Sequence, residues 1–202
     1  MKKIFLGVLV LVGVGVAAVG WWYYRTVAVW SGAVPEILTE KLEKDTDTMS
    51  IEFTSRIDAP VETVFRAFSE PERGAEFSNI VRYSKLVQNE GNRKVVELEM
   101  VILGRPQRLV LAFTFFPDDR RVTIQTVENP MSDLNGTYRF TASPDGTKTL
   151  LTYTGTAKDK VKMPIPLALQ KSALRESFVA SVQALKKGLV AQQAPAPAKS
   201  AS

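Results

Sequence analysis

Residues 57–65 read IDAPVETVF, and within this stretch the chain changes from a strand pattern to a helix pattern. Before Pro60, the pattern of residues 50–57 predicts a β-strand. After Pro60, apolar side chains recur at the spacing of one helix face: Val61, Val64, Phe65 and Phe68. Proline suits the first turn of a helix because its φ is already fixed near the helical value. The stretch therefore predicts a strand followed by a short amphipathic helix.

A second short helix is expected from Pro71 to about Phe77, and from Ile80 onward the apolar period changes to two. Six strands are predicted, at 80–88, 93–103, 106–116, 121–128, 134–142 and 148–157. The short turns between them favour an antiparallel meander. A long helix is expected to begin near residues 164–166, with an apolar stripe of Leu167, Leu174, Phe178, Val182, Leu185 and Leu189.

Four stretches carry a resemblance to a known family: IDAPVETVF at 57–65, SEPER at 69–73 before Phe77, GTYRF at 136–140, and DGT at 145–147 with LTY at 151–153. They resemble the SRPBCC superfamily, also called START-like or Bet v 1-like. The resemblance implies an α+β helix-grip fold over residues 49–190. In that fold a curved antiparallel seven-stranded sheet, in the order β-α-α-β6-α, wraps around a long C-terminal helix. It also implies a cavity for sterols, acyl chains or other hydrophobic ligands.

The N-terminal segment has the properties of a membrane span. Residues 4–24 carry no charge, and a helix of this length reaches ~31 Å, which matches the bilayer core. The run ends in four aromatic residues, 21–24, and Arg25 follows, as expected at a membrane interface. Lys2 and Lys3 favour a cytoplasmic N-terminus. We therefore predict a transmembrane anchor at 1–25 and an extracytoplasmic domain, periplasmic in a bacterium. The alternative is a signal peptide cleaved near Ala18-Val19-Gly20, which predicts a secreted protein.

The remaining segments are predicted to be connecting or terminal. Residues 26–48 have the composition of a juxtamembrane linker, with a short polar helix from Pro35 to Lys44. Residues 191–202 are rich in Ala, Pro, Gln, Lys and Ser and are predicted to be a disordered tail.

The composition excludes several chemistries. The chain has no Cys and no His, so disulfides, thiol nucleophiles and histidine metal sites are excluded, and neither metal nor cofactor is predicted. The net charge of +5 comes largely from Lys2, Lys3 and Arg25; the remainder holds 23 basic against 21 acidic residues. This balance, without a basic run, argues against a nucleic-acid partner.

Alternation along the strands predicts which side chains face inward. The inward set is Val96, Leu98, Met100, Ile102, Leu109, Leu111, Phe113, Phe115, Val122, Ile124, Tyr138 and Phe140. The last strand stays open, because Leu150 cannot face the same way as Leu151 and Tyr153. The predicted ligand-binding residues are Met100, Leu111, Phe113, Tyr138 and Phe178, with the Tyr138 hydroxyl as the polar contact.

Polyketide cyclases and dehydratases share the fold that the resemblance implies, so an enzyme is an alternative. Such chemistry needs a positioned acid or base. The candidates are Tyr83, Glu97, Glu99, Arg105, Asp133, Arg139 and Tyr153. Glu97 and Glu99 lie two positions apart, which places both on the outward face of a strand. No catalytic residue is therefore predicted.

Three functions remain after the sequence is considered. The favoured one is a membrane-anchored, non-catalytic carrier or sensor of a lipid or other hydrophobic small molecule. The alternatives are a cyclase- or dehydratase-like enzyme, and a non-catalytic interaction module whose protein partner is unknown.

Overall fold

The computed structural model describes residues 28–102, 104–161 and 165–193. The chain divides into two compact units, residues 1–35 and 36–202, each of which is described by itself. In the first unit, Ala28–Trp30 form a 3₁₀ turn, η1. The second unit holds the sheet and the longer helices.

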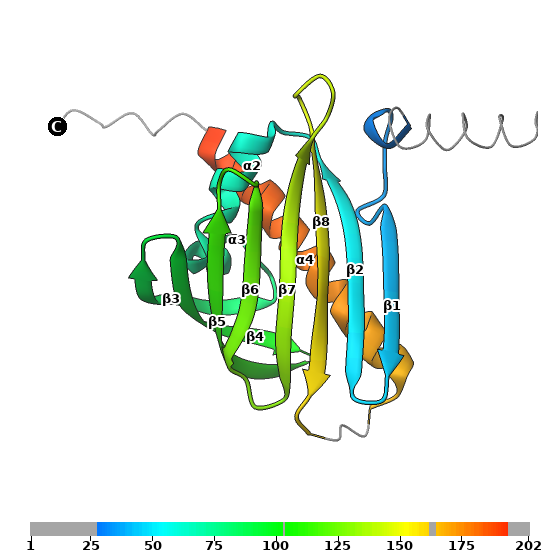
Figure 1. Ribbon diagram of the computed structural model, residues 1–202, viewed down its shortest axis with the longest axis vertical. Helices are drawn as coiled ribbons and strands as arrows, with labels where there is room; N and C mark the ends of the chain where they lie inside the picture. Colours follow the sequence, from blue (N-terminus) through cyan, green and yellow to red (C-terminus); the bar gives the residue numbers. More distant parts are fainter. Residues whose placement is uncertain (1–27, 103, 162–164, 194–202) are drawn as a thin grey trace, which may run out of the picture. The chain divides into compact units, whose positions relative to one another are not determined.

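Eight antiparallel strands form one curved sheet (Figure 1). The strands are β1 (Thr39–Asp45), β2 (Thr48–Ile57), β3 (Val81–Glu90), β4 (Arg93–Ile102), β5 (Arg105–Phe116), β6 (Arg121–Glu128), β7 (Ser132–Ala142) and β8 (Thr149–Asp159). Their spatial order is β1-β2-β8-β7-β6-β5-β4-β3. Each strand therefore pairs with the next strand along the chain, except that β2 pairs with β8 instead of β3. This pairing brings the first predicted strand beside the last one.

The sequence predicted a seven-stranded sheet, which was wrong, because the sheet has eight strands. The additional strand, β1, lies within residues 26–48, where a linker with a short polar helix was expected. Leu42 is its buried side chain, and the other positions are exposed or half-buried. β1 pairs with β2 from Thr39↔Thr54 to Asp45↔Thr48. Backbone pairing to an existing strand, rather than an apolar pattern of its own, holds this segment in the sheet.

The two short helices and the long helix that were predicted after the first strand are present. α2 (Val61–Phe68) follows Pro60, and α4 (Leu167–Gln193) is the long C-terminal helix. The second short helix consists of a 3₁₀ turn, η2 (Pro71–Arg73), followed by one α-turn, α3 (Gly74–Phe77). Leu167 is an exception to the predicted apolar stripe of α4, because at the first turn of the helix it remains 43% exposed.

The helices cover one face of the sheet (Figure 1). α4 runs across the concave face, and α2 and α3 lie beside its C-terminal half. Phe178 of α4 stacks on Phe53 of β2, with ring centroids 4.6 Å apart, and both rings are buried. Register shifts in β3–β4 and β5–β6 help the sheet to bend, since a bulge increases local strand curvature. This arrangement is the helix-grip fold that was predicted.

The predicted transmembrane anchor at 1–25 lies outside the described residues. No helix in the described part of the chain is both long enough and apolar enough to cross a membrane. Residues 194–202 of the predicted tail also lie outside the described part, whereas α4 includes residues 191–193.

Candidate functional site

A cavity of about 350 Å³ lies between the sheet, α4 and the segment that joins α2 to β3. Its volume falls in the range of ~300–1,000 Å³ that is usual for small-molecule sites. The sheet side of its lining includes Phe53, Leu98, Met100, Leu111, Phe113 and Ile124, and the helix side includes Leu174, Phe178 and Leu185. The walls are therefore mainly aliphatic and aromatic.

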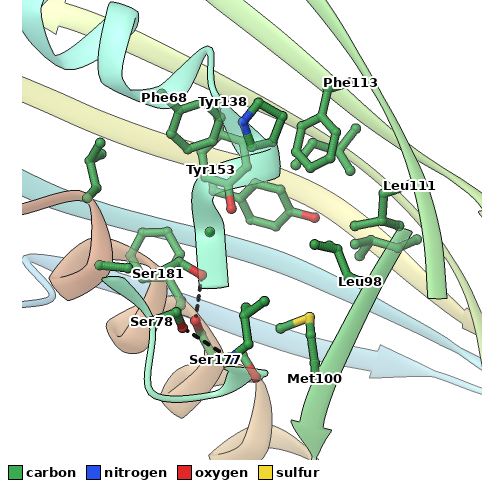
Figure 2. Close-up of a pocket in the computed structure, with 18 of the residues that line it drawn as sticks. Phe68, Ser78, Leu98, Met100, Leu111, Phe113, Tyr138, Tyr153, Ser177 and Ser181 are labelled. Atoms are coloured by element: carbon green, nitrogen blue, oxygen red, sulfur yellow. Dashed lines mark hydrogen bonds between the residues drawn. The ribbon is translucent and has the colours of Figure 1, made fainter. Parts of the chain in front are cut away.

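Aromatic side chains gather at one end of the cavity, called here the tyrosine end (Phe68, Tyr138 and Tyr153; Figure 2). Tyr138 on β7 and Tyr153 on β8 are directly paired across the sheet, and their ring centroids lie 4.7 Å apart. Phe68 of α2 packs on Tyr138, also at 4.7 Å. The hydroxyl groups of Tyr138 and Tyr153 are the polar groups of the tyrosine end, whose surface is otherwise apolar.

Two glycines make room for Tyr153. Gly136 and Gly155 face each other across β7 and β8. A Cβ atom built at Gly155 would lie 2.6 Å from the Tyr153 hydroxyl oxygen, and one built at Gly136 would lie closer still. Neither position can therefore carry a side chain while the phenol stays in place. The Tyr153 hydroxyl rests in the recess above this glycine pair.

The hydroxyl of Tyr153 is buried without a hydrogen bond. The residue is 6% exposed, and its oxygen finds no partner among the described residues. Burial raises the pKa of Tyr153 well above its usual value. Burial also raises the pKa of Tyr138, with a further contribution from the nearby Tyr153. Both phenols therefore stay protonated at physiological pH, and each hydroxyl can donate a hydrogen bond to a ligand.

Three serines mark the other end of the cavity, called here the serine end (Ser78, Ser177 and Ser181; Figure 2). Within α4, Ser177 Oγ donates to Ala173 O and Ser181 Oγ donates to Ser177 O, each at 2.8 Å. Ser181 is exposed although it also lines the cavity. The cavity therefore reaches the surface near the serine end.

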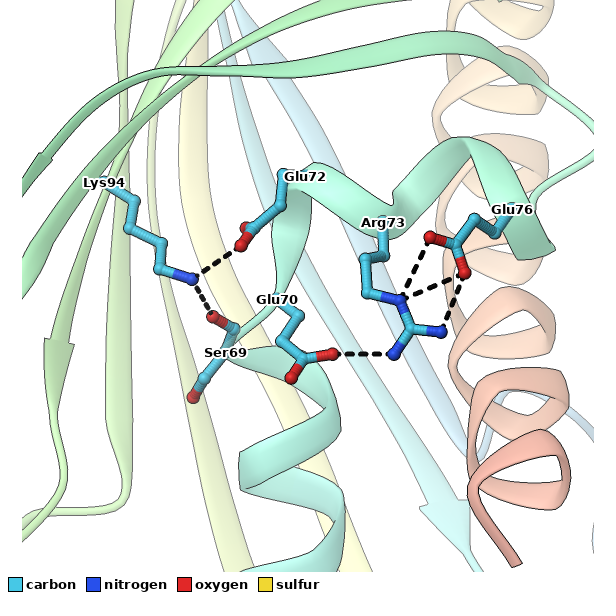
Figure 3. A network of polar contacts seen from close by, with 6 residues as sticks. All are labelled: Ser69, Glu70, Glu72, Arg73, Glu76 and Lys94. Carbon is cyan, nitrogen blue, oxygen red and sulfur yellow. Dashed lines mark hydrogen bonds and ion pairs between the residues drawn. The ribbon is translucent and has the colours of Figure 1, made fainter. Parts of the chain in front are cut away.

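Residues 69–78 cover part of the cavity and are called here the cover segment. Lys94 on β4 holds this segment with two contacts, from Nζ to Glu72 Oε1 and to Ser69 O, each 2.9 Å long (Figure 3). Ser84 on β3 donates to Glu72 O and accepts from the Ala75 N–H. The cover segment is thus fastened to two strands by polar contacts.

Arg73 is a cation in the cavity lining, and its charge is already paired (Figure 3). Its guanidinium contacts Glu76 at 2.7 Å and Glu70 at 2.9 Å. The hydrogen bond to Glu76, followed by the one to Glu70, raises the pKa of Arg73. The same bond from Arg73 lowers the pKa of Glu76. A ligand carboxylate would therefore have to compete with two protein carboxylates for this cation.

The sequence profile of one family, described as polyketide cyclase/dehydrase and lipid transport, matches residues 48–190. The chain belongs to this family. The membership confirms the SRPBCC, START-like resemblance on which the fold was predicted. No curated protein matches the chain significantly.

Solved structures with the same fold have low sequence identity to this family member. The Zhui aromatase/cyclase of Streptomyces sp. R1128 aligns with a TM-score of 0.64 at 15% identity, covering 72% of this chain and 95% of its own. A START superfamily protein from Mycobacterium smegmatis aligns at 0.59 with 15% identity, covering 71% and 99%. The protein TTHA0849 from Thermus thermophilus aligns at 0.59 with 21% identity, covering 72% and 99%. At such identities the similarity establishes the fold alone.

The structure places all five residues that were predicted to bind the ligand on the cavity lining: Met100, Leu111, Phe113, Tyr138 and Phe178. Their contact with a ligand stays a prediction. The orientation of β8, which the sequence left open, is settled by burial: Leu151 and Tyr153 face the core, and Leu150 is half-buried on the other face. Sequence reasoning missed the three serines, because small polar residues carry no pattern of their own. It predicted the short helix of the cover segment but not the position of that segment against the cavity.

Of the residues weighed as acids or bases, Tyr153 lies in the cavity lining. Glu97 pairs with Arg108 at 2.9 Å, and Asp133 pairs with Lys160 at 2.7 Å. No three His, Cys, Asp or Glu side chains gather in a metal-binding arrangement within the described ranges.

Proposed function

We propose that this chain is a non-catalytic binding protein, a carrier or sensor, for a lipid or another hydrophobic small molecule. The single observation that carries the proposal is the cavity of about 350 Å³ between sheet and helix. Family membership supports it, because the family description includes lipid transport. Apolar lining suits such a ligand, since each buried CH₂ group contributes ~0.8 kcal/mol to transfer from water.

The proposal also includes a membrane anchor at residues 1–25 and an extracytoplasmic domain. It rests on the uncharged run at 4–24, the aromatic residues before Arg25, and Lys2 and Lys3. An anchor would hold the cavity close to a source of hydrophobic ligand.

A cavity-filling substitution on α4 tests the proposed binding. Ser177 lines the cavity and is half-buried, so Ser177→Trp is expected to fill its serine end. Ser172 is exposed on the same helix, and Ser172→Trp introduces the same residue outside the cavity. The full chain, held in an amphipathic polymer, is titrated with the uncharged fluorescent probe N-phenyl-1-naphthylamine.

We expect the Ser177→Trp variant to bind the probe at least about tenfold more weakly than the wild type, because the indole occupies the probe's space. The Ser172→Trp variant is expected to bind like the wild type. Equal binding by all three proteins would contradict the proposal. The far-UV circular dichroism of the variants checks that the fold is retained.

The second candidate is a cyclase- or dehydratase-like enzyme, and the observation that favours it is the pair of phenols in the cavity. Because burial raises the pKa of Tyr138 and of Tyr153, either phenol stays protonated and is suited to polarise a substrate carbonyl by a hydrogen bond rather than to transfer its proton. The Zhui protein, which shares the fold, is an aromatase/cyclase. Turnover of a poly-β-ketone substrate, lost in the Tyr138→Phe or Tyr153→Phe variant, would favour the enzyme over the carrier.

A further inference from the structure

The hydroxyl of Tyr153 is a buried polar group whose presence the fold does not explain. It finds no hydrogen-bond partner among the described residues, although Tyr153 is 6% exposed. Buried hydroxyls nearly always have a partner, because losing their hydrogen bonds to water without replacement costs free energy. A phenylalanine would preserve the ring packing against Tyr138 and avoid that cost.

The surrounding sequence accommodates this oxygen. Gly136 and Gly155 leave the recess in which it lies, and a Cβ atom at either position would overlap it. Glycine weakens a strand interior, since it has no side chain to pack and loses more backbone freedom on folding. Tyr153 lines the cavity, and the paired glycines lie against its unpartnered hydroxyl. This combination indicates a polar contact made in the ligand-bound state.

We propose that the ligand carries a neutral oxygen acceptor, such as a ketone, quinone or ester carbonyl, and that the Tyr153 hydroxyl donates a hydrogen bond to it. This inference rests on the proposed function, because it names the class of ligand for the same cavity. The ring of Tyr138 packs against that of Tyr153, with centroids 4.7 Å apart, so the ligand oxygen is expected at the tyrosine end of the cavity.

The charges around the cavity argue for a neutral acceptor rather than a carboxylate. Arg73 is the cation in the cavity lining, and it is bound to Glu70 and Glu76. A carboxylate brought beside Tyr153 would therefore be buried without a free counter-charge, which is costly. A carbonyl needs one donor, and the protonated phenol supplies it.

Two probes of matched shape test the inference. Fluorene and 9-fluorenone share the same flat ring system and differ by the carbonyl oxygen. Each is used to displace N-phenyl-1-naphthylamine from the full-length wild type and from the Tyr153→Phe variant. The Tyr83→Phe variant is the matched control, because Tyr83 is 44% exposed on β3 and removal of its hydroxyl leaves the cavity unchanged.

We expect the wild type and the Tyr83→Phe variant to bind 9-fluorenone about tenfold more tightly than fluorene, the ratio expected of one additional hydrogen bond. The Tyr153→Phe variant is expected to bind both probes with the affinity that the wild type has for fluorene. The infrared carbonyl band of bound 9-fluorenone is expected at lower frequency in the wild type than in the Tyr153→Phe variant.

Three results would overturn the inference. The first is equal binding of the two probes by the wild type. The second is a carbonyl preference that survives in the Tyr153→Phe variant, and the third is one that disappears in Tyr138→Phe instead. In each of these cases the cavity still binds hydrophobic molecules, and the proposed function stands. If neither probe displaces the dye and the dye itself does not bind, the proposed function fails together with the inference.

Discussion

The recess above Gly136 and Gly155 holds the hydroxyl of Tyr153 at a cost to the stability of the ligand-free protein. An unsatisfied buried hydroxyl costs about 1–3 kcal/mol relative to one that keeps its hydrogen bonds. Residues that lower stability in this way are characteristic of binding sites. A group that the ligand needs in the bound state can destabilise the ligand-free protein.

Removing this hydroxyl is expected to stabilise the ligand-free chain. The Tyr153→Phe variant should have a free energy of unfolding about 1 kcal/mol higher than the wild type, because the unpartnered oxygen is lost and the ring remains. Urea unfolding of the protein, followed by far-UV circular dichroism, measures the difference. The Tyr83→Phe variant serves as the control and should differ little from the wild type, since its hydroxyl is exposed. A Tyr153→Phe variant less stable by about 1 kcal/mol or more would indicate that the hydroxyl has a partner, such as a buried water.

At the residue scale, strand alternation predicted most inward-facing side chains correctly. Leu98, Leu111 and Phe113 are buried on the core side, as their positions in β4 and β5 predicted. The side chains of β8 could not be assigned, because Leu150 and Leu151 are adjacent and both apolar. Pairing resolves the orientation: Tyr153 faces Phe53 on one neighbouring strand and Tyr138 on the other. That information is held by the sheet and is absent from the strand's own sequence.

The cover segment, residues 69–78, is the element whose position depends most visibly on polar contacts. Lys94 Nζ contacts Glu72 Oε1 and Ser69 O, and both charged side chains are largely buried. The other oxygen of the Glu72 carboxylate, Oε2, is buried without a hydrogen bond among the described residues. The positive charge of Lys94 therefore compensates the negative charge of the Glu72 carboxylate.

Removing the lysine is expected to loosen the cover segment. The Lys94→Met variant keeps an apolar stem of similar length but leaves Glu72 without its cation, so we expect a loss of about 1–3 kcal/mol in unfolding free energy. Amide hydrogen exchange in residues 70–77 is expected to accelerate more than exchange in β7 and β8. Hydrogen exchange with mass-spectrometric detection measures both regions in one experiment.

Two further variants separate this effect from a general change of charge. Lys85→Met removes an exposed lysine from β3 and should leave exchange in the cover segment unchanged. Adding Glu72→Gln to Lys94→Met should recover part of the lost stability, because the uncompensated carboxylate is then gone. Exchange in residues 70–77 that is the same in the Lys94→Met variant and the wild type would show that other contacts hold the cover segment.

The element that sequence reasoning misassigned is β1. Its residues, TEKLEKD, include strong helix formers and one buried apolar side chain, Leu42, which gives no period of two. Charged side chains are usual on an edge strand, where they discourage pairing with other molecules. The segment becomes a strand because β2 offers a free edge, a tertiary effect that outweighs local helix propensity.

On the scale of the whole molecule, the cavity is a property of the assembled fold. The sequence could indicate which faces are apolar, and the family resemblance predicted a sheet that grips a helix. The volume itself depends on where small side chains fall: Ser177, Ala184 and Gly188 line the α4 side, opposite larger groups on the sheet. Whether facing side chains meet or leave a space is decided by packing in three dimensions, which alternation along one strand does not encode.

The central claim is that this cavity holds a hydrophobic small molecule, and native mass spectrometry of the full chain purified from its host cell tests it most directly. We predict a species heavier than the bare chain by the mass of one small apolar molecule, which dissociates on activation. The Ser177→Trp variant is predicted to lack this species, and the Ser172→Trp variant to retain it. A wild-type protein that carries no such molecule, and that takes none up when mixed with a total lipid extract, would contradict the account.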